Sequence, residues 1–167
     1  SKLSRAFLVP SASVEPLIDL SYRLTRFRLG GNLFILNGLN LACLLGRNPG
    51  EIQELRDILP PWILFVSFEG YGVLPEERVK YQETDFRAMA RLCHLKPATT
   101  ISGASAEEVL RLLSQPSPEP YWKTRFKGGC HDIFFLTTLD KTPEFVAAMS
   151  DLAQRPRYPA EDIGVYI

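Results

Sequence analysis

The residues with the greatest potential for chemistry stand together between Tyr121 and Thr138, in the stretch YWKTRFKGGCHDIFFLTT. A thiol, an imidazole and a carboxylate, Cys130-His131-Asp132, follow the pair Gly128-Gly129 and precede an apolar run. The glycine pair allows a sharp turn or the close approach of another group. An imidazole that faces a cleft at such a point can accept a proton, so His131 is our candidate catalytic residue. A structural or solvent-facing histidine fits the same pattern.

Two further groups of polar side chains are candidates for binding a substrate. Glu69 and Tyr71 are interleaved with glycines directly after an apolar run, a pattern typical of a turn or of a ligand-facing edge. Between residues 121 and 127, cationic side chains that include Arg125 stand beside aromatic ones. This lead-in suits an anionic ligand, and it also suits a solvated edge strand protected by lysines, the interpretation that we favour. Glu69, Tyr71 and Arg125 are therefore the predicted substrate-binding residues.

Cysteine and histidine do not form a metal-binding pattern in this chain. Cys93-His94 and Cys130-His131 are adjacent pairs without the usual spacer, and adjacent ligands on one backbone point apart. We therefore predict no metal site. Neither GxxxxGK[ST] nor a GxGxxG between a strand and a helix occurs, which excludes nucleotide binding through those loops.

Composition indicates an ordinary globular domain. The 167 residues are 46% hydrophobic and 23% charged, and 19 basic residues balance 19 acidic ones, so no polyanion partner such as nucleic acid is expected. Three widely spaced cysteines favour reduced thiols and a cytoplasmic location. No apolar run approaches the roughly 20 residues of a membrane span, so no membrane association is expected.

Hydrophobic spacing predicts strands and helices along the whole chain. Apolar runs predict strands at 5–10, 33–36, 62–68, 97–101, 133–136 and 163–167. Helical spacing and capping patterns predict helices at 13–27, 51–59 and 75–93, and others that begin at Ser105 and Thr142. Residues 37–45 fit either a short helix or a continued strand. We expect Phe27 in the first helix, and Phe145, Met149 and Leu152 in the last, to face inward.

This order of elements predicts a single α+β domain over residues 1–167. The expected fold is ferredoxin-like, with a largely antiparallel sheet whose central strand is 62–68 and with helices packed on one face. The other face would then need a partner, as in a lid that closes over another domain's ligand. The chain also begins without methionine and stops within an apolar alternation, which we interpret as a domain excised from a longer protein.

Three stretches resemble the cap, or substrate, domain of the FAD-linked oxidases of the vanillyl-alcohol oxidase and p-cresol methylhydroxylase type. They are 14–46 (VEPLIDLSYRL to GNLFILNGLNLACLLG), 60–93 (which begins PPWILFVSFEGYG) and 126–167 (FKGGCHDIFFLTT to IGVYI). Together they span nearly the whole chain in the order found in that family.

The resemblance implies oxidation of a small-molecule substrate by hydride transfer to FAD. A separate FAD-binding domain of the same polypeptide would hold most of the flavin, while this chain covers the isoalloxazine ring and shapes the substrate pocket. With the family's aromatic pair aligned on Phe134-Phe135, its flavin-linked histidine falls on Asp132 and its flavin-linked tyrosine on Thr124, three residues after Tyr121. The resemblance thus implies Asp132, Thr124 and Tyr121 as cofactor-binding residues.

A second class of function stays open on the sequence alone. A ferredoxin-like ligand-binding or regulatory module that works without flavin has the same pattern of elements. An open apolar sheet face would favour the cap domain, whereas a pocket enclosed by this chain alone would favour the module. A homo-oligomer is compatible with both.

Overall fold

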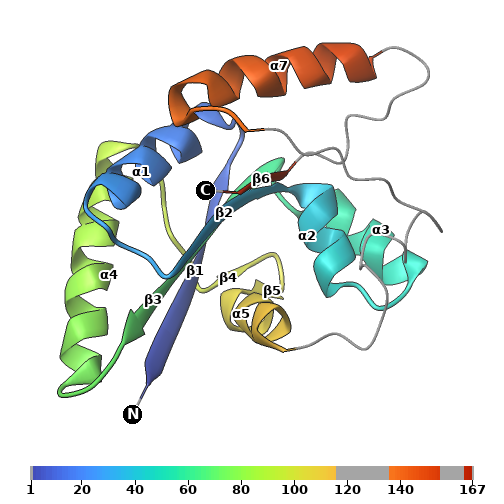
Figure 1. Cartoon of the computed structure of the whole chain (residues 1–167). Coiled ribbons are helices and arrows are strands. Elements are labelled where there is room, and N and C mark those ends of the chain that lie inside the picture. The colour runs from blue at the N-terminus through green and yellow to red at the C-terminus, as the bar shows by residue number, and fades with distance from the viewer. Residues whose placement is uncertain (1, 116–135, 155–163, 167) are drawn as a thin grey trace.

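The computed structural model describes residues 2–115, 136–154 and 164–166 of the chain, the last three by their backbone (Figure 1). The strands of this part are β1 (Leu3–Ser11), β2 (Asn32–Asn37), β3 (Trp62–Gly70), β4 (Thr100–Ile101), β5 (Ala104–Ser105) and β6 (Gly164–Tyr166). Its helices are α1 (Glu15–Arg26), α2 (Gly38–Leu45), α3 (Pro49–Ile58), α4 (Pro75–Leu92), α5 (Ala106–Ser114) and α7 (Thr142–Ala153), with the 3-10 turn η1 (Leu139–Lys141). The protein is thus a mixed α+β structure, as predicted.

One antiparallel sheet with the strand order β1-β3-β2-β6 organises these elements. β3 lies between β1 and β2, which confirms the prediction of a central strand at 62–68. The reason is visible in the sequence, because every residue from Ile63 to Phe68 is buried and only an interior strand hides both faces. β4 and β5 form a separate two-stranded hairpin.

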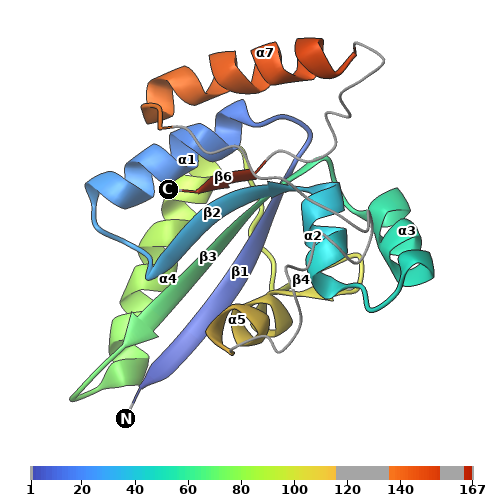
Figure 2. The same ribbon diagram turned by 45° about the vertical axis from the view of Figure 1, so that its right-hand side comes forward.

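Helices cover both faces of the sheet, so the prediction of helices on one face is wrong. Alternate strand residues enter two separate clusters, with Phe7, Val66 and Phe68 in the first and Leu8 and Phe65 in the second. Helices α1 and α4, together with Val146 of α7, complete the first cluster, and α2, α3 and α5 complete the second. Figures 1 and 2 show these two groups of helices on opposite sides of the strands. The strands are apolar at successive positions, which requires a cover on each side.

Two of the three helices on the second side, α2 and α3, start at asparagine caps. The Asn37 side chain accepts a hydrogen bond from the Asn40 amide at 2.9 Å, and that of Asn48 accepts one from the Glu51 amide at 3.0 Å. These caps satisfy amides that the first turn of a helix leaves free. Residues 38–45 are therefore a helix, the first of the two alternatives that the sequence left open.

The predicted strand at 97–101 joins the main sheet at a single point. Ala98 and Leu8 exchange both backbone hydrogen bonds, at 2.8 and 2.9 Å, on the side of β1 that faces away from β3. The chain then leaves the sheet to form the β4–β5 hairpin. Ser105 caps α5 as predicted, because its hydroxyl accepts a hydrogen bond from the Glu108 amide at 3.4 Å.

Two helices differ from the prediction in the direction of their apolar side chains. Phe27 follows the end of α1 and is 65% exposed. In α7, Phe145, Met149 and Leu152 are partly exposed, and the inward positions are Thr142 and Val146. Helical spacing alone does not distinguish two apolar stripes one residue apart, so here only the packing against α1 selects the buried one.

The stretch 121–138, which contains the candidate catalytic residue His131, lies outside the described residues except at its end. Leu136 is fully exposed and belongs to no strand, while the rest of the predicted strand 133–136 is outside the described part. The last predicted strand is present as β6, paired with β2. None of the helices in the described ranges combines the length and the apolar composition of a membrane span.

His94 gives a test of the local backbone. It follows α4 with φ 57°, the left-handed region that a β-carbon disfavours, and it is exposed. We expect His94→Gly to raise the free energy of unfolding by about 1 kcal/mol and the melting temperature by about 3 °C. Lys96→Gly is the control, since Lys96 has no positive φ and should lose stability. Equal losses for both variants in thermal unfolding would contradict this account.

Candidate functional site

A polar strip crosses one half of the second sheet face. On this face, β3 changes along its length from Ile63 and Phe65 to Ser67 and Glu69. Its neighbours change in the same half of the sheet, because Ser4 of β1 lies opposite Glu69 and Asn32 of β2 lies opposite Ser67. We call Ser4, Asn32, Ser67 and Glu69 the polar strip. None of the four belongs to the apolar cluster beneath α2, α3 and α5.

Specific contacts hold the polar strip in place. The Asn32 amide donates a hydrogen bond to the Ser67 hydroxyl at 2.9 Å. The Glu69 carboxylate forms an ion pair with the Lys2 ammonium at 2.9 Å, and the Glu69 side chain is 20% exposed. Lys2 also lies 5.5 Å from the centre of the Tyr71 ring, within range of a cation–π interaction. Glu69 and Tyr71, both predicted from the sequence, are thus brought together through Lys2.

The turn after β3 fixes the end of the strip. Gly70 is required there, since a β-carbon on it would lie 2.2 Å from the Pro75 carbonyl oxygen. The chain then continues through Gly72 at φ 73° and Leu74 at φ 56° into α4. The Gln82 amide of α4 donates to the Glu69 carbonyl oxygen at 3.1 Å, which ties the helix to the strand end. Tyr71 is left half exposed beside the strip.

The polar strip can bind a ligand through hydrogen bonds. The Glu69 carboxylate, the Ser4 hydroxyl and the Asn32 amide lie on one side of the sheet with the Tyr71 ring at their edge, whereas the Ser67 hydroxyl is fully buried and serves to hold Asn32. Polar groups set at fixed positions orient a ligand rather than supply bulk affinity. Ser4, Asn32, Ser67 and Lys2 were not predicted from the sequence. Polar residues inside otherwise apolar strands were the signal, but only the register shows that those of different strands lie side by side.

Five predicted site residues cannot be compared with this geometry. His131, Asp132, Thr124, Tyr121 and Arg125 all lie outside the described residues. Their roles in catalysis, in cofactor binding and in substrate binding stay predictions.

Cys93 and His94 diverge, as expected for adjacent residues. Cys93 is buried and its thiol donates to the Asp19 carboxylate at 3.3 Å, whereas His94 is exposed. Burial, followed by the hydrogen bond to Asp19, raises the pKa of the Cys93 thiol to about 11. Within the described residues no group of three His, Cys, Asp or Glu side chains is placed to hold a metal ion.

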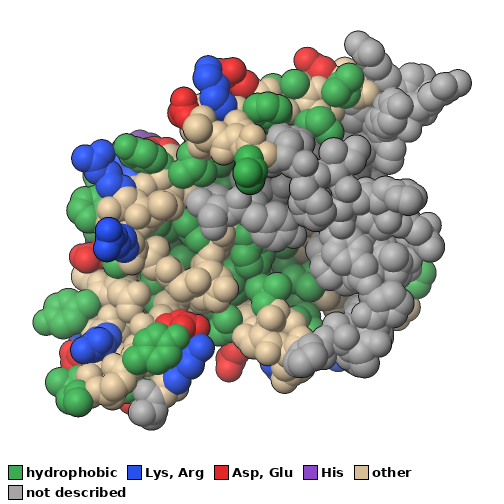
Figure 3. All heavy atoms as spheres, in the orientation of Figure 1, with side chains coloured by type: hydrophobic (Ala, Val, Ile, Leu, Met, Phe, Trp, Pro, Cys, Tyr) green, Lys and Arg blue, Asp and Glu red, His purple; other side chains and the backbone are tan. Residues whose placement is uncertain are grey.

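Two shallow hollows lie near the strip and at the start of α2. The first, of about 260 Å³, lies at the α1–β2 loop and includes Gly31, where a β-carbon would lie 3.3 Å from the Glu69 side chain. The second, of about 300 Å³, includes Asn37 and Arg56. Both are open to solvent, so neither encloses a ligand by itself. In the space-filling view, charged side chains stand out along α1 and α4, and hydrophobic side chains are visible deeper over the sheet (Figure 3).

Comparisons with models of known protein families, with curated proteins and with solved structures find no match to this chain.

The Cys93 thiol predicts a change of stability at alkaline pH. Its pKa of about 11 in the folded chain exceeds the ordinary value of 9.0, so folding favours the protonated thiol. This stabilisation is complete below pH 9 and is lost as the pH rises towards 11. We expect the free energy of unfolding, measured with urea, to fall more steeply over this interval in the unsubstituted chain than in Cys93→Ala. The two proteins are compared by the slope of this free energy against pH, because the substitution also removes a packed side chain and lowers stability at every pH. Parallel curves for the two proteins would contradict the prediction.

Proposed function

We propose that this chain is the substrate-binding cap domain of an FAD-dependent oxidoreductase, where it covers the flavin and shapes the substrate pocket. The supporting observation is that the three stretches that resemble that family lie side by side in the sheet. The first supplies β2, the second β3 and the third β6, and these strands are neighbours in one sheet. Segments far apart in the sequence thus form one continuous unit, as a shared domain would require.

The strand order supports a ferredoxin-like topology for this unit. Such a fold runs β-α-β-β-α-β, and its last strand lies beside its first. Here β1, α1, β2, β3 and α4 follow in that order, and the segment after α4 touches the outer side of β1 at Ala98. We infer that 97–101 is the shortened counterpart of the final strand and that β6 extends the sheet on the opposite side.

The polar strip is the part of the sheet that we assign to the substrate. Glu69 and Tyr71 would bind it there, and Arg125 remains a further candidate. FAD would be held mainly by an FAD-binding domain of the same polypeptide, with Asp132, Thr124 and Tyr121 as this chain's contribution. His131 would act as proton acceptor or orient the substrate. What supports the strip's assignment is its set of hydrogen-bonding groups, of which Asn32 is exposed and the Glu69 side chain is 20% exposed.

One observation favours the alternative, a ligand-binding or regulatory module without flavin. An open apolar sheet face would have favoured the cap domain. Instead, α2, α3 and α5 cover the apolar half of the second face. A chain with a core on both sides of its sheet needs no second domain for its stability. Flavin content therefore decides between the two functions.

The first test is the flavin content of the whole gene product. We expect it to purify with bound FAD, whereas residues 1–167 alone should lack flavin absorbance, because contacts on one side of the ring do not replace those to the adenine and pyrophosphate. A flavin-free gene product that carries a DNA-binding or kinase domain instead would overturn the proposal.

Glu69→Gln in the flavoprotein tests the strip. Loss of the charge should raise KM roughly tenfold and change kcat less than about twofold, because a ground-state contact is removed. Stability should hardly change, since the Lys2 pair is exposed on one side. Glu54→Gln, at an exposed position of α3, is the matched control. Identical kinetics for both variants would exclude Glu69 from substrate binding.

A further inference from the structure

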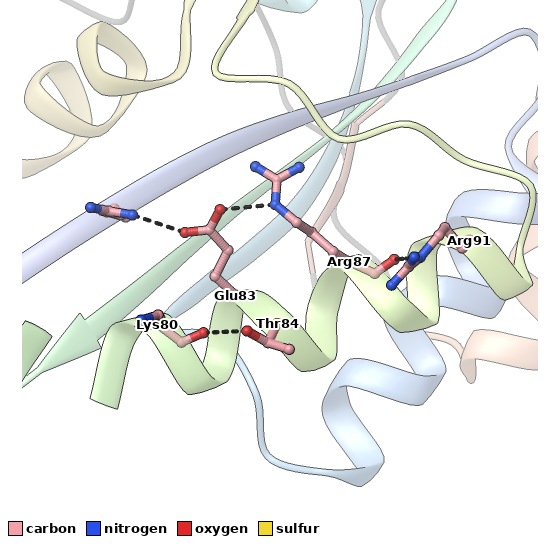
Figure 4. A network of polar contacts seen from close by, with 6 residues as sticks. Lys80, Glu83, Thr84, Arg87 and Arg91 are labelled. Atoms are coloured by element: carbon pink, nitrogen blue, oxygen red, sulfur yellow. Dashed lines mark hydrogen bonds and ion pairs between the residues drawn. The ribbon is translucent and has the colours of Figure 1, made fainter. Parts of the chain in front are cut away.

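One carboxylate in this protein holds two arginines from different elements. The carboxylate of Glu83, on α4, accepts two hydrogen bonds. One comes from the Arg5 guanidinium of β1 at 3.0 Å, and the other comes from the Arg87 guanidinium of α4 at 2.8 Å. Arg5 projects from the same face of β1 as Phe7, so its side chain meets α4. Figure 4 shows Glu83 between its two partners, with the terminal nitrogens of Arg87 directed away from the carboxylate.

This cluster differs in charge from the other arginine pairs on described helices. Arg23 is matched by Asp19, and Arg111 by Glu108, one carboxylate to each guanidinium. At Glu83 two guanidinium groups share one carboxylate, which leaves one positive charge uncompensated within the cluster. An ordinary surface ion pair accounts for the first two sites but not for the extra arginine at the third.

The arginines are held in position before any ligand arrives. Glu83 is 18% exposed, and although burial acts to raise its pKa, the hydrogen bonds from Arg87 and Arg5 outweigh it and lower the pKa. The Arg87 guanidinium also lies 5.1 Å from the centre of the buried Phe7 ring. A carboxylate and an aromatic ring together restrict this side chain, which reduces the entropy lost on binding.

The donors that remain face solvent. Arg5 and Arg87 each donate a single hydrogen bond to Glu83, and their other nitrogens have no partner among the described residues. We propose that Arg5 and Arg87 form a binding site for an oxyanion, the phosphate or carboxylate group of a small molecule. The planar fork of a guanidinium matches the paired oxygens of such a group. The site lies on the α4 side of β1, on the opposite face from the polar strip, and does not depend on the proposed flavin function.

Titration of the 167-residue chain with inorganic phosphate tests the site, with acetate at equal ionic strength as a second arm. We expect saturable binding by calorimetry with a Kd on the order of 1 mM, as befits two charge-assisted contacts. Tighter binding of phosphate assigns the site to phosphate groups, and tighter binding of acetate assigns it to carboxylates. Arg87→Lys, which keeps the charge but removes the fork, should raise the Kd at least about tenfold.

Arg111→Lys is the matched control, because it alters a fully paired arginine on α5 and should leave the Kd within about twofold. Arg5→Lys tests the second fork independently, in case the Phe7 contact makes Arg87→Lys unstable. The proposal is overturned if neither anion saturates. It is likewise overturned if Arg111→Lys weakens binding as much as Arg87→Lys, because binding would then reflect general charge alone.

Discussion

The pairing of β3 with β1 on one side and β2 on the other constrains the position of every other described element. Six consecutive residues of β3 are buried, and their alternation sends three to each face. Each face then has to be covered, which places α1 and α4 against one and α2, α3 and α5 against the other. A shift of one residue in either pairing would exchange the two faces of β3 and expose both clusters.

The same register creates the two polar surfaces. On the second face, polar residues of three strands meet at two successive levels of the register, Asn32 with Ser67 and Ser4 with Glu69, and form the polar strip. On the first face, Arg5 lies opposite Phe68 in the pairing of β1 with β3, and it meets Glu83 of α4. Both surfaces lie towards the N-terminal end of β1. One strand thus links the polar strip, which carries the Glu69 carboxylate, with a cationic surface on its opposite face.

The covered second face changes how a cap role would work. A lid with an open apolar face would bind its partner domain by burying that face. In this protein the apolar half of the sheet is already packed, so contact with another domain would fall on polar surfaces and on exposed apolar side chains such as Tyr71, Val73 and Leu74. Interfaces between domains of one chain are commonly polar, and they permit relative motion.

The sequence by itself determined the kinds of most elements and their main boundaries, because prolines at helix starts, the Ser105 cap and the dense apolar run at 62–68 act locally, but it left residues 37–45 open between helix and strand. Central placement of β3 followed from its dense apolar run. What only the tertiary structure decided was which residues meet. Strand register brought Asn32 to Ser67 and Ser4 to Glu69, and helix packing turned Phe145 outward and Val146 inward. Contacts of this kind join residues more than thirty positions apart, and no periodicity within one segment reports them.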